Sequence, residues 1–282
     1  MAEPRLLIFG LGYTGTAVMH AAIGAGFAVT GTVRLVGAGI PFDEAAASIA
    51  QSTHLLSTVP PDVSGDPVLS RYADAIDQAA HLRWIGYLSS TGVYGDRRGD
   101  WVDEGTQPAP VSDRSRRRLA AEQAWGRLAD RCGVDVFRLA GIYGPARSVF
   151  DDLRAGTARL VGKPGHTFGR IHRDDIVSAV IAAMQQRRES GVRLLNLVDD
   201  EPAESAEVIA EAARLLGVAV PEATPFELAW PAMSPMARSF WAEHRKVSGL
   251  RAQQVLGLRW RYPSYREGLR AILAEESGKR PA

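Results

Sequence analysis

The chain has 282 residues, of which 46% are hydrophobic and 23% charged, and its formal net charge is +1. This composition is typical of a soluble globular protein and excludes the disordered, collagen-like and membrane classes. Because the net charge is close to zero, we expect no nucleic-acid or membrane partner, and any anion site has to be local. The single cysteine, Cys132, can form neither an intrachain disulfide nor a thiolate metal cluster, which favours a cytoplasmic protein without a metal site.

Short runs of branched apolar residues alternate with helical patterns in the N-terminal part, which predicts parallel strands joined by crossover helices. Strands are expected at 5–9, 27–33, 39–42, 54–58, 84–89, 134–139 and 192–198. Helices are expected at 13–25, 67–82 and 113–131, and from about Asp174 onward. Since right-handed crossovers leave few alternatives, the pattern predicts an α/β fold with a Rossmann-type, doubly wound parallel sheet.

Glycine and proline become frequent after about residue 145, and helical patterns return at 204–216, 234–243, 247–256 and 264–275. This change predicts a smaller, loop-rich C-terminal lobe. The expected division is a sheet domain of residues 1–145 plus about 171–198, and a substrate lobe of about 146–170 plus 199–282.

A GxGxxG motif follows the first predicted strand and opens the first predicted helix. Gly10 permits a tight turn, Gly12 allows backbone to approach a pyrophosphate, and Gly15 allows the helix to pack closely on the strand. Tyr13 and Thr14 lie at the helix N-terminus, where free amide groups and the helix dipole attract a diphosphate. The motif therefore predicts a dinucleotide cofactor.

The end of the second predicted strand favours NADP(H), with NAD(H) left open. An acidic residue there would bind the ribose diol, whereas an arginine suits a 2′-phosphate. Arg34 occupies this place and no acidic residue precedes Asp43, so Arg34 is either the phosphate ligand or an exposed loop residue. Asp43 either accepts a hydrogen bond from the adenine amino group or caps a turn. Val59 and Pro60 follow the fourth strand, and we expect their backbone to lie along the cofactor.

Four later segments, at 87–96, 138–145, 170–175 and 196–200, follow the glycine motif in a recognisable order. Together they resemble the extended short-chain dehydrogenases/reductases, the group that contains NAD-dependent epimerases and dehydratases. The tail, at 246–248 and 262–269, resembles the atypical branch of that family. The resemblance implies an NAD(P)-binding sheet and a lobe that binds a small-molecule substrate. It also implies that the cofactor touches Ser89, Ala140, Gly141 and Ile142.

The resemblance further implies a catalytic group in which tyrosine and lysine are spaced as YxxxK, so that lysine lowers the tyrosine pKa from one helical turn away. Aligning the chain on residues 120–122 places Arg114 at the tyrosine position and Arg118 at the lysine position. A guanidinium cannot exchange a proton near neutral pH as a phenol does.

Other residues still fit parts of that chemistry. Ser90 is expected to hydrogen-bond a substrate carbonyl, Arg118 to contact the ribose, and Arg114 to bind an anionic substrate group. The alternative is a solvated basic helix face with an Arg118–Glu122 pair. Tyr94 is either a substitute acid or a packed core residue.

Two functions therefore stay open. One is an NADP(H)-dependent oxidoreductase or epimerase/dehydratase-like enzyme that acts on a small molecule without the YxxxK pair. The other is a catalytically silent NADP(H)-binding sensor or interaction protein. The family resemblance also allows a homodimer formed through helix faces.

Overall fold

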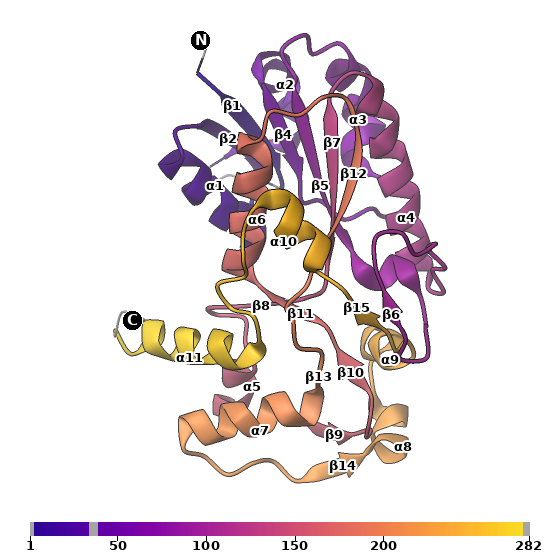
Figure 1. Ribbon diagram of the computed structural model, residues 1–282, viewed down its shortest axis with the longest axis vertical. Helices are drawn as coiled ribbons and strands as arrows, with labels where there is room; N and C mark the ends of the chain where they lie inside the picture. The colour runs from indigo at the N-terminus through magenta and orange to yellow at the C-terminus, as the bar shows by residue number, and fades with distance from the viewer. Residues whose placement is uncertain (1–2, 34–38, 279–282) are drawn as a thin grey trace.

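The computed structural model describes residues 3–33 and 39–278. Parallel strands form a seven-stranded central sheet in the order β12-β7-β5-β4-β1-β2-β3 (Figure 1). The strands are β1 (Arg5–Phe9), β2 (Ala28–Val33), β3 (Ile40–Pro41), β4 (His54–Ser57), β5 (Trp84–Ser90), β7 (Gly133–Leu139) and β12 (Gly191–Leu197). The chain starts in the middle of the sheet, runs outward through β2 and β3, and then crosses to β4. The strand order thus reverses between β1 and β4, where open α/β sheets bind their ligands. The predicted fold class is confirmed.

Successive residues of the strands point to opposite faces of the sheet, and each face has its own hydrophobic core. In β1, Leu6 and Ile8 belong to one core while Leu7 and Phe9 belong to the other. The first core is covered by α1 (Tyr13–Gly24), α6 (Arg173–Gln185) and α10 (Leu250–Leu256). The second is covered by α2 (Ala46–Gln51), α3 (Pro67–Asp77) and α4 (Asp113–Gly126), as Figure 1 shows for α3 and α4.

A third core lies below the carboxyl ends of the strands and is built from α5 (Val149–Arg154), α7 (Ser205–Leu216) and α11 (Tyr265–Glu276) (Figure 1). Phe150, Val208 and Leu269 meet in it. Short elements lie before and between these helices. They are β8 (Gly141–Tyr143), β9 (Leu160–Gly162), β10 (Thr167–Phe168), β11 (Arg170–His172), β13 (Ala203–Glu204), β14 (Ala223–Pro225), α8 (Phe226–Ala229), α9 (Pro235–Trp241) and β15 (Lys246–Val247). The last of them, β15, pairs with β6 (Trp101–Val102). The helix α10 follows in sequence but packs Ala252 and Leu256 into the first core.

Several predicted boundaries are wrong, each for a local reason. The strand predicted at 39–42 ends at Pro41, which lacks the N–H needed to continue a ladder, and Asp43 lies exposed in the 3-10 turn Phe42–Glu44. The helix predicted at 67–82 ends at Asp77, because Ala79 N–H bonds back to Ile76 in a tighter turn. The helix α2 was not predicted, since its six residues give no readable periodicity.

None of the helices in the described ranges has the length and apolar character needed to cross a membrane.

Candidate functional site

The glycine motif forms a rigid turn between β1 and α1. Gly10 has φ +93°, its N–H bonds Thr32 Oγ1 at 3.1 Å, and its carbonyl accepts from Thr58 Oγ1 at 2.7 Å. A Cβ at Gly15 would lie 2.1 Å from the Gly10 carbonyl oxygen, so the helix can start here only with glycine at this position. These two glycines therefore serve the fold.

Gly12 stands in a different environment. Among the described residues, a Cβ at this position would meet no neighbouring atom within 4 Å, and the backbone is extended, with φ −90° and ψ −161°. Gly12 is the N-cap residue of α1, yet within residues 3–33 and 39–278 no side chain caps the first turn. The first amide groups of α1 thus face open space, as an anion-binding helix terminus requires.

A cleft of about 520 Å³ extends from this turn along the carboxyl ends of the strands. It gathers many of the residues singled out from the sequence, namely Gly12, Tyr13, Thr14, Gly15, Ser89, Ser90, Arg114, Arg118, Ala140, Gly141 and Ile142. Gly10, Asp43, Val59, Pro60 and Tyr94 do not line it. Arg34 lies outside the described residues.

Ser90 ends β5, is half-buried and lines the cleft. Its Oγ accepts a hydrogen bond from Gly92 N at 3.1 Å, which leaves the hydroxyl proton free to be donated to a ligand. Ser89 points the other way, and its Oγ donates to the buried carboxylate of Glu122 at 2.5 Å.

The two arginines of α4 are held differently. Arg118 Nη1 donates to Tyr87 Oη and to the Leu88 carbonyl, both at 2.9 Å, so its guanidinium is fixed against β5. The expected alternative of an Arg118–Glu122 pair is wrong, because Glu122 pairs with Arg138 at 2.7 Å. Arg114 lines the cleft one turn earlier, and partial burial together with the charge of Arg118 lowers the pKa of Arg114.

Tyr94 occupies the core and not the cleft. Its ring is fully buried beneath the Arg138 guanidinium at 4.8 Å, and its hydroxyl donates to Asn196 Oδ1 at 2.9 Å. Burial raises the pKa of Tyr94. Of the two interpretations of Tyr94, a substitute acid and a packed core residue, the structure favours the packed core residue.

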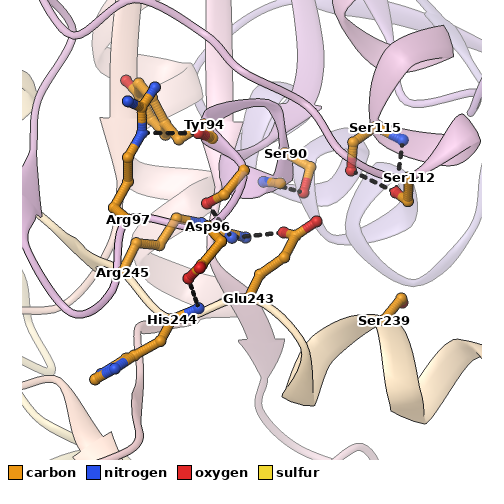
Figure 2. Close-up of polar contacts among 12 residues, drawn as sticks. Ser90, Tyr94, Asp96, Arg97, Ser112, Ser115, Ser239, Glu243, His244 and Arg245 are labelled. Carbon is orange, nitrogen blue, oxygen red and sulfur yellow. Dashed lines mark hydrogen bonds and ion pairs between the residues drawn. The ribbon is translucent and has the colours of Figure 1, made fainter.

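The far wall of the cleft comes from residues that sequence reasoning missed. Ser239 and Phe240 of α9 line it, together with Glu243 and Arg245 just before β15. Arg245 Nη1 donates to Glu243 Oε2 at 2.6 Å and to the Gly95 carbonyl at 2.9 Å (Figure 2). No motif marks this segment in the sequence, whereas Ser115 in the first turn of α4 could have been found, because it lies three residues before Arg118 and so on the same helix face.

An aromatic cluster behind this wall supports α9. His166 stacks on Trp241, with ring centres 5.4 Å apart, and on His244 at 4.5 Å. Burial, assisted by the positive charges of Lys163 and His244, lowers the pKa of His166 to about 4, against the opposing effects of Asp96 and of a hydrogen bond to the Phe240 backbone. His166 is therefore neutral in the folded protein at neutral pH.

We expect the contribution of His166 to stability to be lost as the pH falls from 6.5 toward 4. A histidine that is neutral when folded but has an ordinary pKa when unfolded contributes stability above pH 6.5, and loses it as the pH approaches its folded pKa. For His166 the loss at pH 5 is on the order of 1–2 kcal/mol. His54 and His172, whose pKa values are also lowered to about 4 by burial, act in the same direction. Burial raises the pKa of Asp175 to about 6, which acts in the opposite direction.

Thermal unfolding at pH 7.5 and pH 5.0 measures this effect. The Tm difference between the two pH values should be smaller in His166→Gln than in the wild type, and unchanged in His20→Gln, which alters an exposed histidine. An equal Tm difference in all three proteins would contradict the role of His166.

Comparison with known proteins supports the fold in detail. A conserved protein of unknown function from Silicibacter pomeroyi DSS is 40% identical, with a TM-score of 0.86 over 96% of this chain and 99% of that one. The human epimerase family protein SDR39U1, solved with NADPH, is 19% identical with a TM-score of 0.77 over 95% of this chain and 98% of that one. The chain thus shares the fold of the NAD-dependent epimerase/dehydratase-type proteins, the fold that the sequence resemblance predicted. It belongs to the same family as the Silicibacter pomeroyi protein.

Curated relatives match more locally. The 3-diazoavenalumate denitrifying reductase of a Streptomyces species is 30% identical over 152 residues, which is 50% of this chain. Protein YeeZ of Escherichia coli K12 is 32% identical over 175 residues, or 60% of this chain. The matched part spans 47% and 61% of the length of these two relatives. No protein-family model matches the chain.

Proposed function

We propose that the protein binds NADP(H) in the cleft and reduces a small carbonyl compound there. One observation carries the proposal: the uncapped start of α1 at Gly12 opens onto the same cleft as Ser90 and Arg118. A phosphate site and a carbonyl-polarising hydroxyl thus share one cavity. The reductase and the NADPH complex among the similar proteins support the same proposal.

The residues present fit a dinucleotide. The free space at Gly12 and the uncapped amides of α1 suit a diphosphate, and Ala140, Gly141 and Ile142 line the part of the cleft expected to hold the nicotinamide. Arg118, fixed on β5, presents a positive charge for the ribose. When bound, NADPH supplies a hydride to the substrate's carbonyl carbon.

Ser90 has the simplest chemical role. Its free hydroxyl proton is available to hydrogen-bond the carbonyl oxygen, which stabilises the negative charge that develops on that oxygen during reduction. A proton from solvent in the cleft completes the alcohol. Among the described cleft residues the one phenol is Tyr13, whose hydroxyl is already bonded to the Pro145 carbonyl at 2.9 Å, so no tyrosine takes the usual acid role.

The same lack of a phenolic acid favours a second candidate, an NADP(H)-binding sensor without turnover. Titration with NADPH and NADH, followed by nicotinamide fluorescence, tests the part that both functions share. We expect tighter binding of NADPH, and we expect Arg34→Ala to weaken NADPH binding far more than NADH binding. Binding of neither nucleotide would overturn both candidates.

Replacing Ser90 separates the two candidates. Ser90→Ala should keep the affinity for NADPH, because Ser90 makes its described contacts within the turn at Gly92. It should lower the rate of NADPH oxidation with a reducible carbonyl by about 10²- to 10³-fold, as loss of one oxyanion donor does. Screening carbonyl compounds for NADPH oxidation with both proteins provides the measurement. Turnover that is equal in the two proteins would remove Ser90 from the mechanism, and turnover in neither would favour the sensor.

A further inference from the structure

Three polar groups from three separate segments converge on Gly92, which follows β5. The position that a Cβ would take at Gly92 lies 3.0 Å from Ser115 Oγ, 3.4 Å from Ser90 Oγ and 4.0 Å from Arg245 Nη2. Ser115 belongs to α4, and Arg245 precedes β15. All four residues line the cleft, and Figure 2 shows the three side chains approaching from different sides. Because Gly92 has no side chain, nothing projects from it between the three groups, and a ligand in the cleft can approach all three of them.

The groups at this point are free to donate. Ser115 Oγ accepts from Ser112 Oγ at 2.9 Å, so its own proton remains available, as does that of Ser90. Both described hydrogen bonds of the Arg245 side chain use Nη1, while Nη2 faces Gly92. The Arg245 side chain is only 15% exposed and is fixed by Glu243, so its position is set before a ligand arrives.

The surrounding charge is positive. Five arginines line the cleft, at positions 114, 118, 147, 170 and 245, against the single carboxylate of Glu243, which already pairs with Arg245. Within the described ranges, neither Arg114 nor Arg118 pairs with a carboxylate, although both lie on the wall formed by α4. A bound anion would therefore be attracted on two sides and would meet no free carboxylate in this part of the cleft.

We propose that the substrate is a small carbonyl compound carrying a carboxylate next to the carbonyl. Ser115 and Arg245 bind its carboxylate at Gly92, and Ser90 bonds the neighbouring carbonyl oxygen. The three polar atoms lie within 4.0 Å of one point. A ligand that bonds all three therefore has to carry its carbonyl oxygen and its carboxylate oxygens on adjacent carbon atoms. The inference rests on the proposed reductase and assigns its substrate class.

Oxamate is a suitable probe, because it joins an amide carbonyl directly to a carboxylate and cannot be reduced like a ketone. Oxamide has nearly the same shape without the charge, and inorganic phosphate tests whether any anion suffices. Each is titrated into the NADPH-loaded protein by calorimetry. We expect oxamate to bind at least about tenfold more tightly than oxamide and phosphate, in line with the strength of charge-assisted hydrogen bonds.

Variants locate the binding. Gly92→Ala places a methyl group at the meeting point, and should abolish oxamate binding while NADPH binding is retained. Ser115→Ala and Arg245→Lys should each weaken oxamate binding about tenfold. Ser70→Ala, a serine in the first turns of α3 away from the cleft, is the matched control and should bind oxamate like the wild type.

The outcomes are distinguishable. Failure to bind NADPH would overturn the proposed function itself. Normal NADPH binding with oxamate no tighter than oxamide, or with full oxamate binding by Gly92→Ala and Ser115→Ala, would overturn the substrate class alone. Phosphate binding as tight as oxamate binding would show a general anion site and would also overturn the carboxylate assignment.

Discussion

Gly12→Val should abolish most NADPH binding and leave the fold intact. The valine side chain would occupy the space through which the backbone at α1 meets the diphosphate, so we expect the affinity to fall about a hundredfold, or ~2.7 kcal/mol. The fold should tolerate valine because no neighbouring atom of the described residues lies within 4 Å of the new Cβ and the backbone is already extended. Fluorescence titration with NADPH and thermal unfolding measure the two effects separately.

Gly24→Val is the matched control, because Gly24 ends the same helix and also has no neighbour within 4 Å of its Cβ position. It should bind NADPH like the wild type. If Gly12→Val also retained its affinity, the diphosphate would not lie at the start of α1 and the reading of the glycine motif would be wrong.

The contrast between Gly12 and Gly15 explains why the sequence was informative at this end of the site. A strand, a glycine turn and a helix that follow one another within 20 residues are local, so spacing alone assigns each glycine its place. The structure then separates their roles: Gly15 is required by the Gly10 carbonyl 2.1 Å from its Cβ position, whereas no contact with the described part of the chain requires glycine at position 12. We therefore attribute the glycine at position 12, which packing does not require, to the binding of a ligand.

The substrate side of the cleft could not be predicted in the same way. Arg245 reaches Gly95 across 150 positions of sequence, and nothing in its neighbourhood forms a motif. Its place depends on β15 pairing with the two-residue strand β6, which is too short to be read from a pattern. Tyr94 shows a different limit of the sequence. Its place near a motif allowed both a catalytic role and a packed role, and only the structure shows that its hydroxyl donates to Asn196 in the core.

Glu122→Ala should destabilise the protein by about 3–5 kcal/mol, the usual cost of breaking a buried ion pair from one side. The side chains of Glu122 and Arg138 are 4% and 3% exposed, and the carboxylate accepts from Arg138 Nη2 at 2.7 Å and from Ser89 Oγ at 2.5 Å. The variant would leave the Arg138 guanidinium buried without a counter-charge, and its Nη1 already has no hydrogen-bond partner in the part of the chain that the structure describes. Thermal unfolding should show a Tm lower by roughly 10 °C.

Two comparisons identify the cause of that loss. Asp113→Ala removes an ion pair on the same helix, but one whose side chains are 77% and 56% exposed, so its Tm should hardly change. The double variant Glu122→Leu with Arg138→Met removes both buried charges and should be more stable than Glu122→Ala, because no charge is left unpaired. A double variant as unstable as the single one would mean that packing, and not the buried charge, explains the loss. Because Ser89 precedes Ser90, this pair also holds the end of β5 in the position that the proposed chemistry requires.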